Sequence, residues 1–270
     1  MTNLGNLPPA QKRTFVRLDG RSVTEESANV AEEVPVAFVY GGKPHVVMMC
    51  TPTDLEDLAI GFTLSEEIAS RATDITRVEV VRHARGIEVQ MELPPEAQAR
   101  VAERTRALAG RTGCGLCGID AIDNAIRAPR VVESLARFSV GAVTRAGDAL
   151  AAQQPINNDT RAVHAAAYAS ADGELRVVRE DVGRHNALDK VIGSLARSGT
   201  NPMTGFFVVT SRASYELVQK VAVAGAPLLA AVSRPTGLAI RFAEEAGITL
   251  VGLLRGASAN VYSHTGRILL

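Results

Sequence analysis

The 270-residue sequence predicts an α/β protein in two parts, a small N-terminal α+β domain followed by a larger α/β layered domain. Residues 14–93 carry short alternating apolar runs joined by turn residues, as in β-hairpins. From residue 163 onward, continuously apolar runs alternate with segments of helical periodicity. Such runs are typical of strands covered on both faces, which is the layered arrangement of α/β domains.

The first part is expected to begin with a disordered segment and a short strand. Two hairpins follow, and Thr53 with Glu56 has the spacing of a capping box for the helix between them. The predicted elements are a disordered lead-in over 1–13, strands over 14–18, 34–40 and 45–50, a two-stranded hairpin over 78–93, and a helix from the prolines at 94–95 to about 109. The small α+β domain is therefore placed at residues 14–109.

The second part is predicted to be an α/β domain over residues 119–270. Its expected strands cover 163–168, 175–178, 206–210, 228–232 and 248–254, and its expected helices cover 183–197, 213–224 and 236–246. Between the two parts lies a glycine-rich cysteine loop, residues 110–118.

The cysteine loop contains Cys114 and Cys117, two of the three cysteines in the chain. Four glycines in the loop leave its backbone accessible to a large ligand or a partner protein. Residues 119–126 have helical spacing, which would put both cysteines close to a helix N-terminus, where the thiolate is favoured. The loop is interpreted as a site that handles sulfur.

The cysteine pair has other possible roles. A structural zinc site needs four ligands, and only Cys50 and scattered histidines could complete one, so no metal site is expected. The His-x-Glu pattern of zinc deaminases is absent. A thioredoxin-type dithiol would normally lie in a small βαβ domain, whereas this pair follows a predicted helix at a domain junction. The third cysteine, Cys50, is most simply a buried residue. A persulfide carrier fits better, because it needs a thiolate on a flexible loop.

Arginine follows three of the predicted strands, at Arg212, Arg234 and Arg255. Ligands of open α/β sheets bind at the carboxyl ends of strands, where helix N-termini and arginine favour phosphate. Each arginine alone could be an ordinary surface residue, whereas three on one edge favour a ligand with several phosphates. In the polar stretch 180–190, Asp181 could cap a helix, and His185 could be a general base or a packing residue.

The bulk composition limits where the protein works. The formal net charge is zero, which gives no general attraction to nucleic acid. The N-terminus lacks the pattern of a signal peptide, no run of about 18 apolar residues could span a membrane, and three cysteines are too few for a disulfide-stapled fold. A cytoplasmic protein that binds neither nucleic acid nor membrane is expected.

With these features assembled, the chain closely resembles the FdhD family, the formate dehydrogenase accessory sulfurtransferases. The resemblance runs from about Glu33 to the C-terminus. It is carried by residues 33–36, 61–66, 114–118, 164–167, 180–190 and 210–220. One departure concerns residues 159–163, Asp-Thr-Arg-Ala-Val, where the family usually has Thr-Gly-Gly; Arg161 and Ala162 in place of glycines would narrow that loop.

The resemblance implies a concrete activity. Such proteins take sulfur from a cysteine desulfurase as a persulfide and pass it to the molybdenum of bis(molybdopterin guanine dinucleotide), which activates formate dehydrogenase. It also implies a homodimer and, for the larger domain, a cytidine deaminase fold without zinc. The persulfide falls on Cys114, with Cys117 assisting. The family's cofactor-binding segment falls on Leu253, Leu254, Arg255, Gly256, Ala257 and Ser258, to which the strand-end argument adds Arg212. The alternative is a non-catalytic chaperone for the same cofactor.

Overall fold

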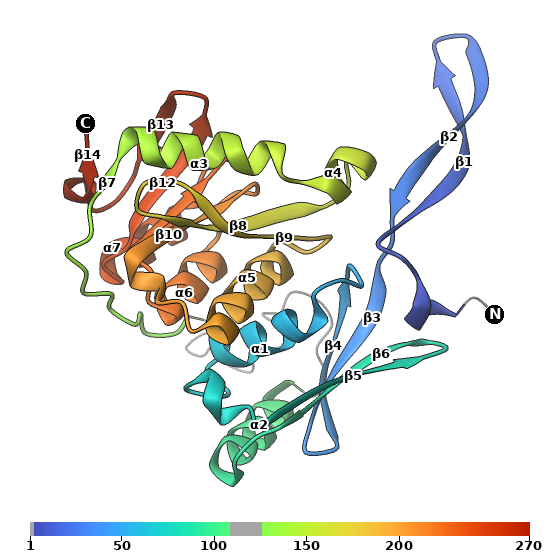
Figure 1. Cartoon of the computed structure of the whole chain (residues 1–270), viewed down its shortest axis with the longest axis horizontal. Helices are drawn as coiled ribbons and strands as arrows, with labels where there is room; N and C mark the ends of the chain where they lie inside the picture. The colour runs from blue at the N-terminus through green and yellow to red at the C-terminus, as the bar shows by residue number, and fades with distance from the viewer. Residues whose placement is uncertain (1–2, 109–125) are drawn as a thin grey trace.

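The computed structural model describes residues 3–108 and 126–270, with the side chains of 102–108 left aside, and contains seven α-helices within these ranges. A six-stranded sheet forms the larger part, and a four-stranded sheet lies beside it (Figure 1). A hairpin, β1 and β2, projects from the N-terminal side. The mixed α/β class predicted from the sequence is confirmed.

The N-terminal hairpin corrects the prediction of disorder over residues 1–13. A 3-10 helix forms at Leu4–Asn6, and strand β1 (Ala10–Asp19) already begins at Ala10. Strand β1 pairs along its whole length with β2 (Ser22–Ala31). The backbone of this segment is held by hydrogen bonds to the β5–β6 hairpin: the Leu4 amide donates to the Ala84 carbonyl at 2.9 Å, and the Arg82 side chain donates to the Gly5 carbonyl. A pattern of side chains does not reveal such backbone partners.

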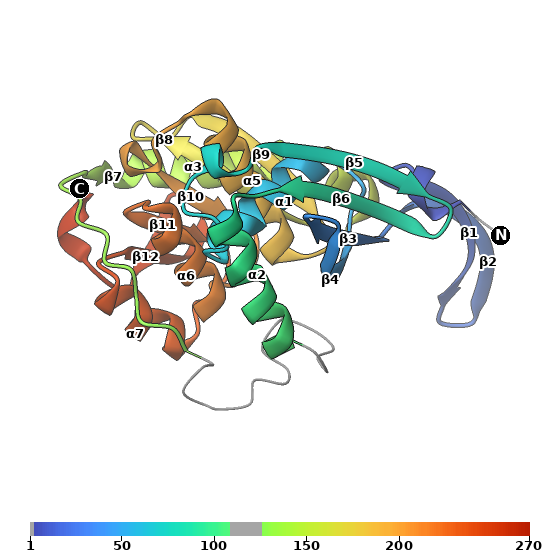
Figure 2. The same cartoon turned by 90° about the horizontal axis from the view of Figure 1, so that it is seen from below.

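The four-stranded sheet has the order β4-β3-β6-β5 and contains both predicted hairpins. Its strands are β3 (Val34–Tyr40), β4 (Lys43–Cys50), β5 (Arg77–His83) and β6 (Gly86–Glu92). Helices α1 (Leu55–Ser65) and α2 (Pro95–Leu108) contribute to the same hydrophobic core, and Figure 2 shows α2 beside β6.

The predicted capping box at Thr53 and Glu56 is wrong. The N-cap of α1 is Asp54, in the left-handed conformation at φ 51°, and no side chain caps the helix. The hydroxyl of Thr53 instead accepts a hydrogen bond from Lys190 at 3.4 Å. A lysine of a helix that packs on the larger sheet therefore binds the side chain that a local rule assigned to the cap.

The six-stranded sheet has the order β13-β12-β11-β10-β8-β9. Strands β10, β11 and β12 are parallel to one another, and β8 runs antiparallel between β10 and β9. The strands are β8 (His164–Ser170), β9 (Leu175–Asp181), β10 (Gly205–Val209), β11 (Leu228–Ala231), β12 (Thr249–Arg255) and β13 (Ser258–Val261). All five strands predicted for this part are present.

Helices cover both faces of this sheet. On one face lie α5 (Arg184–Ser198), α6 (Tyr215–Ala224) and α7 (Gly237–Glu245), around one hydrophobic core. On the other face α3 (Val140–Ala152) packs over a second core. Helix α3, the short α4 (Pro155–Thr160), and the small ladder of β7 (Phe138–Ser139) with β14 (Ile268–Leu269) were not predicted.

Helices α1 and α5 pack against each other between the two sheets (Figure 1), and glycines lie at their contact. A Cβ atom on Gly61 would lie 1.7 Å from the Asp189 carbonyl oxygen, and one on Gly193 would lie 1.9 Å from that of Asp57. The backbones therefore approach too closely for any side chain at these positions. The predicted boundaries, 14–109 and 119–270, and the likeness to cytidine deaminases stay predictions.

Candidate functional site

The candidate site lies at the end of the six-stranded sheet where the carboxyl ends of its parallel strands meet, here called the sheet edge. Because β10, β11 and β12 are parallel, their carboxyl ends meet at this edge, and β9 ends there too. Arg212 follows β10, Arg234 follows β11, and Arg255 ends β12, and all three are exposed. The topology thus brings the three arginines to one edge, as the sequence predicted.

These arginines are electrostatically unmatched. In the parts of the chain with described side chains, neither Arg212, Arg234 nor Arg255 forms an ion pair or donates a side-chain hydrogen bond, whereas Arg179 and Arg197 both bind Asp57. The N-termini of α5, α6 and α7 point to the same edge, since each helix follows one of these strands. Their partial positive charges add to those of the guanidinium groups. The edge is therefore suited to an anionic ligand.

The segment Leu253–Ser258 has an irregular backbone at this edge. A β-bulge separates Gly252 from Arg255, and Leu253 adopts the left-handed conformation at φ 54° while its amide donates to the Ser233 carbonyl at 3.1 Å. Glycine is required just before the bulge, because a Cβ on Gly252 would lie 2.8 Å from Pro235. Non-glycine residues rarely adopt this conformation, and they do so mostly where the structure imposes it.

The predicted cofactor-binding residues do not all face the same way. Leu254 is buried and packs on Gly147 of α3, where an added Cβ would lie 2.5 Å from its Cδ2 atom. Arg255, Gly256, Ala257 and Ser258 are exposed. The Leu254 side chain therefore belongs to the core, and only its neighbours present side chains to solvent.

The polar stretch 180–190 contributes a buried centre. Asp181 does not cap α5, whose N-cap is Gly183; its carboxylate accepts from the amides of Thr51 and Gly183 and lies 2.8 Å from Lys190 Nζ. The expectation of an Asp181 cap is thus corrected, since a long-range partner has displaced the local role. Cys50 is completely buried, as predicted, and burial raises the pKa of its thiol well above the ordinary value.

His185 lies in the first turn of α5, as expected, and its partner is Glu216 of α6. The His185 Nε2 atom is 2.7 Å from Glu216 Oε2. The hydrogen bond from His185, together with the charges of His185 and Arg184, lowers the pKa of Glu216 although its burial acts in the opposite direction. This pair could not be predicted from local patterns, because 31 residues separate its members.

Cys114 and Cys117 lie outside the described residues, so their predicted role is not tested by the geometry. The chain is described again from residue 126, and Arg127 is firmly held: its amide donates to the Tyr215 hydroxyl at 2.8 Å, and its guanidinium to Glu66 at 2.7 Å. Within residues 3–101 and 126–270, no group of three or more His, Cys, Asp or Glu side chains could hold a metal ion.

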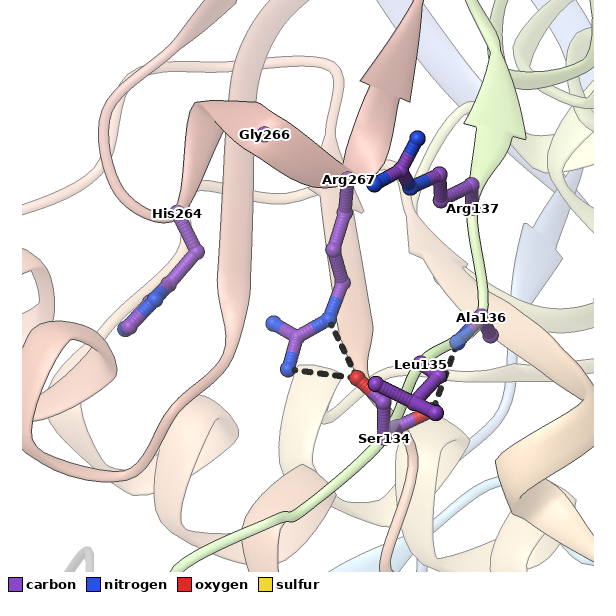
Figure 3. Close-up of a pocket in the computed structure, with 7 residues that line it drawn as sticks. All are labelled: Ser134, Leu135, Ala136, Arg137, His264, Gly266 and Arg267. Carbon is purple, nitrogen blue, oxygen red and sulfur yellow. Dashed lines mark hydrogen bonds between the residues drawn. The ribbon is translucent and has the colours of Figure 1, made fainter.

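Two open cavities lie at the opposite edge of the sheet. One of about 490 Å³ is lined by Ser134, Leu135, Ala136, Arg137, His264, Gly266 and Arg267. Figure 3 shows the Arg267 guanidinium turned to the Ser134 carbonyl, and its remaining donors reach Gly247 and Thr249. The other, about 540 Å³, adjoins the turn between β8 and β9. Neither cavity contains a residue predicted for the site, and the donors of Arg267 are used within the fold.

Among the helices described, none is long and apolar enough to cross a membrane.

Comparison with known proteins identifies relatives along nearly the whole chain. A protein named sulfur carrier protein FdhD from Xanthomonas euvesicatoria is 53% identical over 249 residues, 92% of this chain and 88% of the relative. The protein of that name from Cupriavidus necator is 52% identical over 239 residues, 88% of this chain and 83% of the relative. A crystal structure of a "putative formate dehydrogenase accessory protein" from Desulfotalea psychrophila covers 97% of this chain and 100% of its own, with a TM-score of 0.75 and 23% identity, and shows the fold alone. The model of the FdhD/NarQ family matches residues 31–269, so the chain belongs to this family.

Proposed function

We propose that the protein is a sulfur carrier that serves the maturation of formate dehydrogenase. The observation that carries the proposal is the identity of more than half to proteins named sulfur carrier protein FdhD. The Cys-x-x-Cys pair at Cys114 and Cys117 lies within the segment that the family model matches. The chain is proposed to work in the cytoplasm as a homodimer, with a cysteine desulfurase as sulfur donor and formate dehydrogenase as the recipient.

The proposed reaction begins with the Cys114 thiolate. It attacks the terminal sulfur of the desulfurase persulfide; a new S–S bond forms on Cys114, the S–S bond of the donor breaks, and the donor cysteine leaves as thiolate. The exchange conserves electrons and needs no added oxidant. Cys117 is proposed to assist or relay. The outer sulfur is then proposed to pass to the molybdenum of bis(molybdopterin guanine dinucleotide), which is bound as a substrate. In this transfer the S–S bond on Cys114 would break, Cys114 would leave as thiolate, and the reduced metal of the substrate would supply the two electrons that turn the sulfur into sulfide.

The sheet edge supports the second half of the proposal. The cofactor carries two pyrophosphates. Arg212 and Arg255 offer these groups positive charge, and Gly256, Ala257 and Ser258 are exposed beside Arg255. Strands β12 and β8 are three positions apart, so the edge extends over roughly 14 Å. In this proposal Leu253 and Leu254 contribute backbone shape, because the Leu254 side chain is in the core.

A second candidate function is a chaperone that binds the cofactor and uses no persulfide. The unmatched arginines support the chaperone as well as the sulfur carrier, because they concern binding of the cofactor and not the sulfur chemistry. The two functions differ in whether sulfur becomes bound to Cys114.

Sulfur loading provides the test. The purified protein is incubated with a cysteine desulfurase and cysteine, and its intact mass and peptides are then measured. One added sulfur on Cys114 that a reductant removes is the expected result. Cys50→Ala serves as the matched control, since Cys50 is buried and its thiol resists ionisation, and it should load normally. A protein that binds the cofactor but acquires no sulfur would exclude the carrier and favour the chaperone.

A further inference from the structure

Arg184, in the first turn of α5, has a donor without a partner. Its Nε atom is buried and makes no hydrogen bond within the described structure. Buried polar atoms in proteins are almost always hydrogen-bonded, so an unpaired guanidinium donor requires an explanation. Arg184 also forms no ion pair with the described residues, although a charged group that is partly buried is costly to leave unmatched.

The carboxylates near Arg184 are already committed to other groups. Asp181 binds Lys190 at 2.8 Å, and Glu180 accepts from the amides at the start of α4, Ile156 and Asn157. Glu216 is bound to His185 at 2.7 Å. No described carboxylate lies within 4.0 Å of the Arg184 guanidinium, and Glu216, whose pKa the charge of Arg184 helps to lower, is bound to His185 instead.

Two histidines complete the surroundings of this arginine. His164 begins β8 at the same sheet edge and is partly buried. Its burial, followed by the charges of Arg184 and His185, lowers its pKa, while Asp181 acts in the opposite direction. At His164 the charges of Arg184 and His185 therefore outweigh that of Asp181, and Glu216, bound to His185, is the other acid of this group. The N-terminus of α5, which no side chain caps, adds its partial charge.

We infer that His164, Arg184 and His185 form a subsite for a phosphate group, distinct from the segment Leu253–Ser258. The arginine supplies a charged donor, the histidines supply ring nitrogens, and the uncapped helix start supplies backbone amides. The inference rests on the proposed function in one respect, the identity of the molecule that carries the phosphate group. It extends the anionic site to the β8–β9 end of the sheet edge.

Pyrophosphate titration tests the subsite. Calorimetry should show binding to the wild-type protein, and Arg184→Gln should weaken it by about 10-fold to 100-fold, as expected for loss of a charge-assisted contact. Arg176→Gln is the control, because Arg176 lies near the other end of β9 and pairs with Glu174. Absence of binding to wild type, or equal binding by Arg184→Gln, would overturn the inference. Circular dichroism confirms folding; if Arg184→Gln fails to fold, Arg184→Lys and His164→Asn replace it under the same criterion.

A spectroscopic readout separates ligand contact from a structural role. An anion beside His164 favours its protonated form, so pyrophosphate should raise the pKa of His164 in a titration followed by NMR. An unchanged pKa at saturating pyrophosphate contradicts the subsite. Guanosine diphosphate binding more tightly than pyrophosphate would identify a nucleotide as the source, and equal affinities would identify free phosphate. Sulfur loading of Cys114 is measured separately, so failure of this subsite and failure of the carrier function give different results.

Discussion

The Nζ atom of Lys190 lies 2.8 Å from Oδ2 of Asp181, and both side chains are completely buried. Lys190 also donates to the carbonyls of Thr51 and Glu180, at 3.2 and 3.1 Å. The Thr51 amide in turn donates to Asp181 at 3.1 Å. The pair therefore connects β9 and α5 to Thr51, the residue that follows β4 of the four-stranded sheet.

Replacement of Lys190 by methionine should destabilise the protein strongly. It leaves the Asp181 carboxylate buried without a counterion, which costs about 3–5 kcal/mol in the free energy of unfolding. Urea denaturation followed by circular dichroism measures the loss. The double variant Lys190→Met/Asp181→Asn removes both charges and should recover part of it; a double variant as unstable as the single one would contradict the interpretation.

The sequence anticipated this region only in part. The strands and helices of residues 163–254 follow from local periodicity, and the arginine edge follows from the order of strands. The partners of Asp181 could not be predicted, because Thr51 is 130 residues away and comes from the other sheet. An aspartate just before a helix is predicted to cap it, because its long-range partners are not visible in the sequence. Helix α3 was missed for another reason: Gly141 and Gly147 weaken its local signal, although Gly147 is needed for contact with Leu254.

A substitution at the α1–α5 contact should separate packing from helix propensity. Gly193→Ala places a Cβ atom about 1.9 Å from the Asp57 carbonyl, which forces the helices apart. The expected cost is about 3 kcal/mol, against a gain of roughly 1 kcal/mol in helix propensity. Thermal unfolding measures the net loss. Gly266→Ala is the control, since a Cβ there meets nothing within 4 Å, and it should unfold at nearly the wild-type temperature. Stabilisation by Gly193→Ala would refute the close contact.

Arg161, predicted to stand in place of a glycine of the family, lies at the end of α4. Arg161 is the C-cap residue and adopts the left-handed conformation at φ 58°. Glycine adopts this conformation without steric cost, whereas residues with a Cβ atom adopt it only at a cost in free energy. Arg161→Gly should therefore stabilise the protein by about 0.5–1 kcal/mol in urea unfolding. Arg161→Ala keeps the steric cost and should not stabilise; equal gains from both variants would show that the arginine side chain, and not its backbone, is responsible.

Glu66 makes stability depend on pH. Burial alone would raise its pKa, but Lys220 and Arg127 outweigh burial and lower it to about 2, from an ordinary value of 4.5. The folded state therefore keeps this carboxylate ionised where the unfolded chain binds a proton. Its contribution is complete above about pH 4.5 and is lost as the pH falls toward 2.

Urea unfolding at several pH values measures this effect. Glu66→Gln should be less stable than wild type at pH 7, and the difference should shrink between pH 4.5 and 2. Glu56→Gln is the matched control, because Glu56 pairs with Arg197 on the surface, where both side chains are 47% exposed and such pairs contribute little. A constant difference between Glu66→Gln and wild type over this range would exclude the assignment.

Cys114 and Arg255 should fail in different ways if the protein is a sulfur carrier. Cys114→Ala removes the atom proposed to hold sulfur, so formate dehydrogenase activity in cells should be lost while the purified variant still binds the cofactor. Arg255→Gln removes one unmatched charge from the sheet edge, so cofactor binding should weaken by about tenfold while sulfur loading of Cys114 is unchanged. Arg241→Gln, an exposed position on α7, controls for general loss of charge. Because sulfur and cofactor are assigned to different residues, a Cys114→Ala strain with full activity would leave only the chaperone function, and the sheet edge would then account for all of the activity.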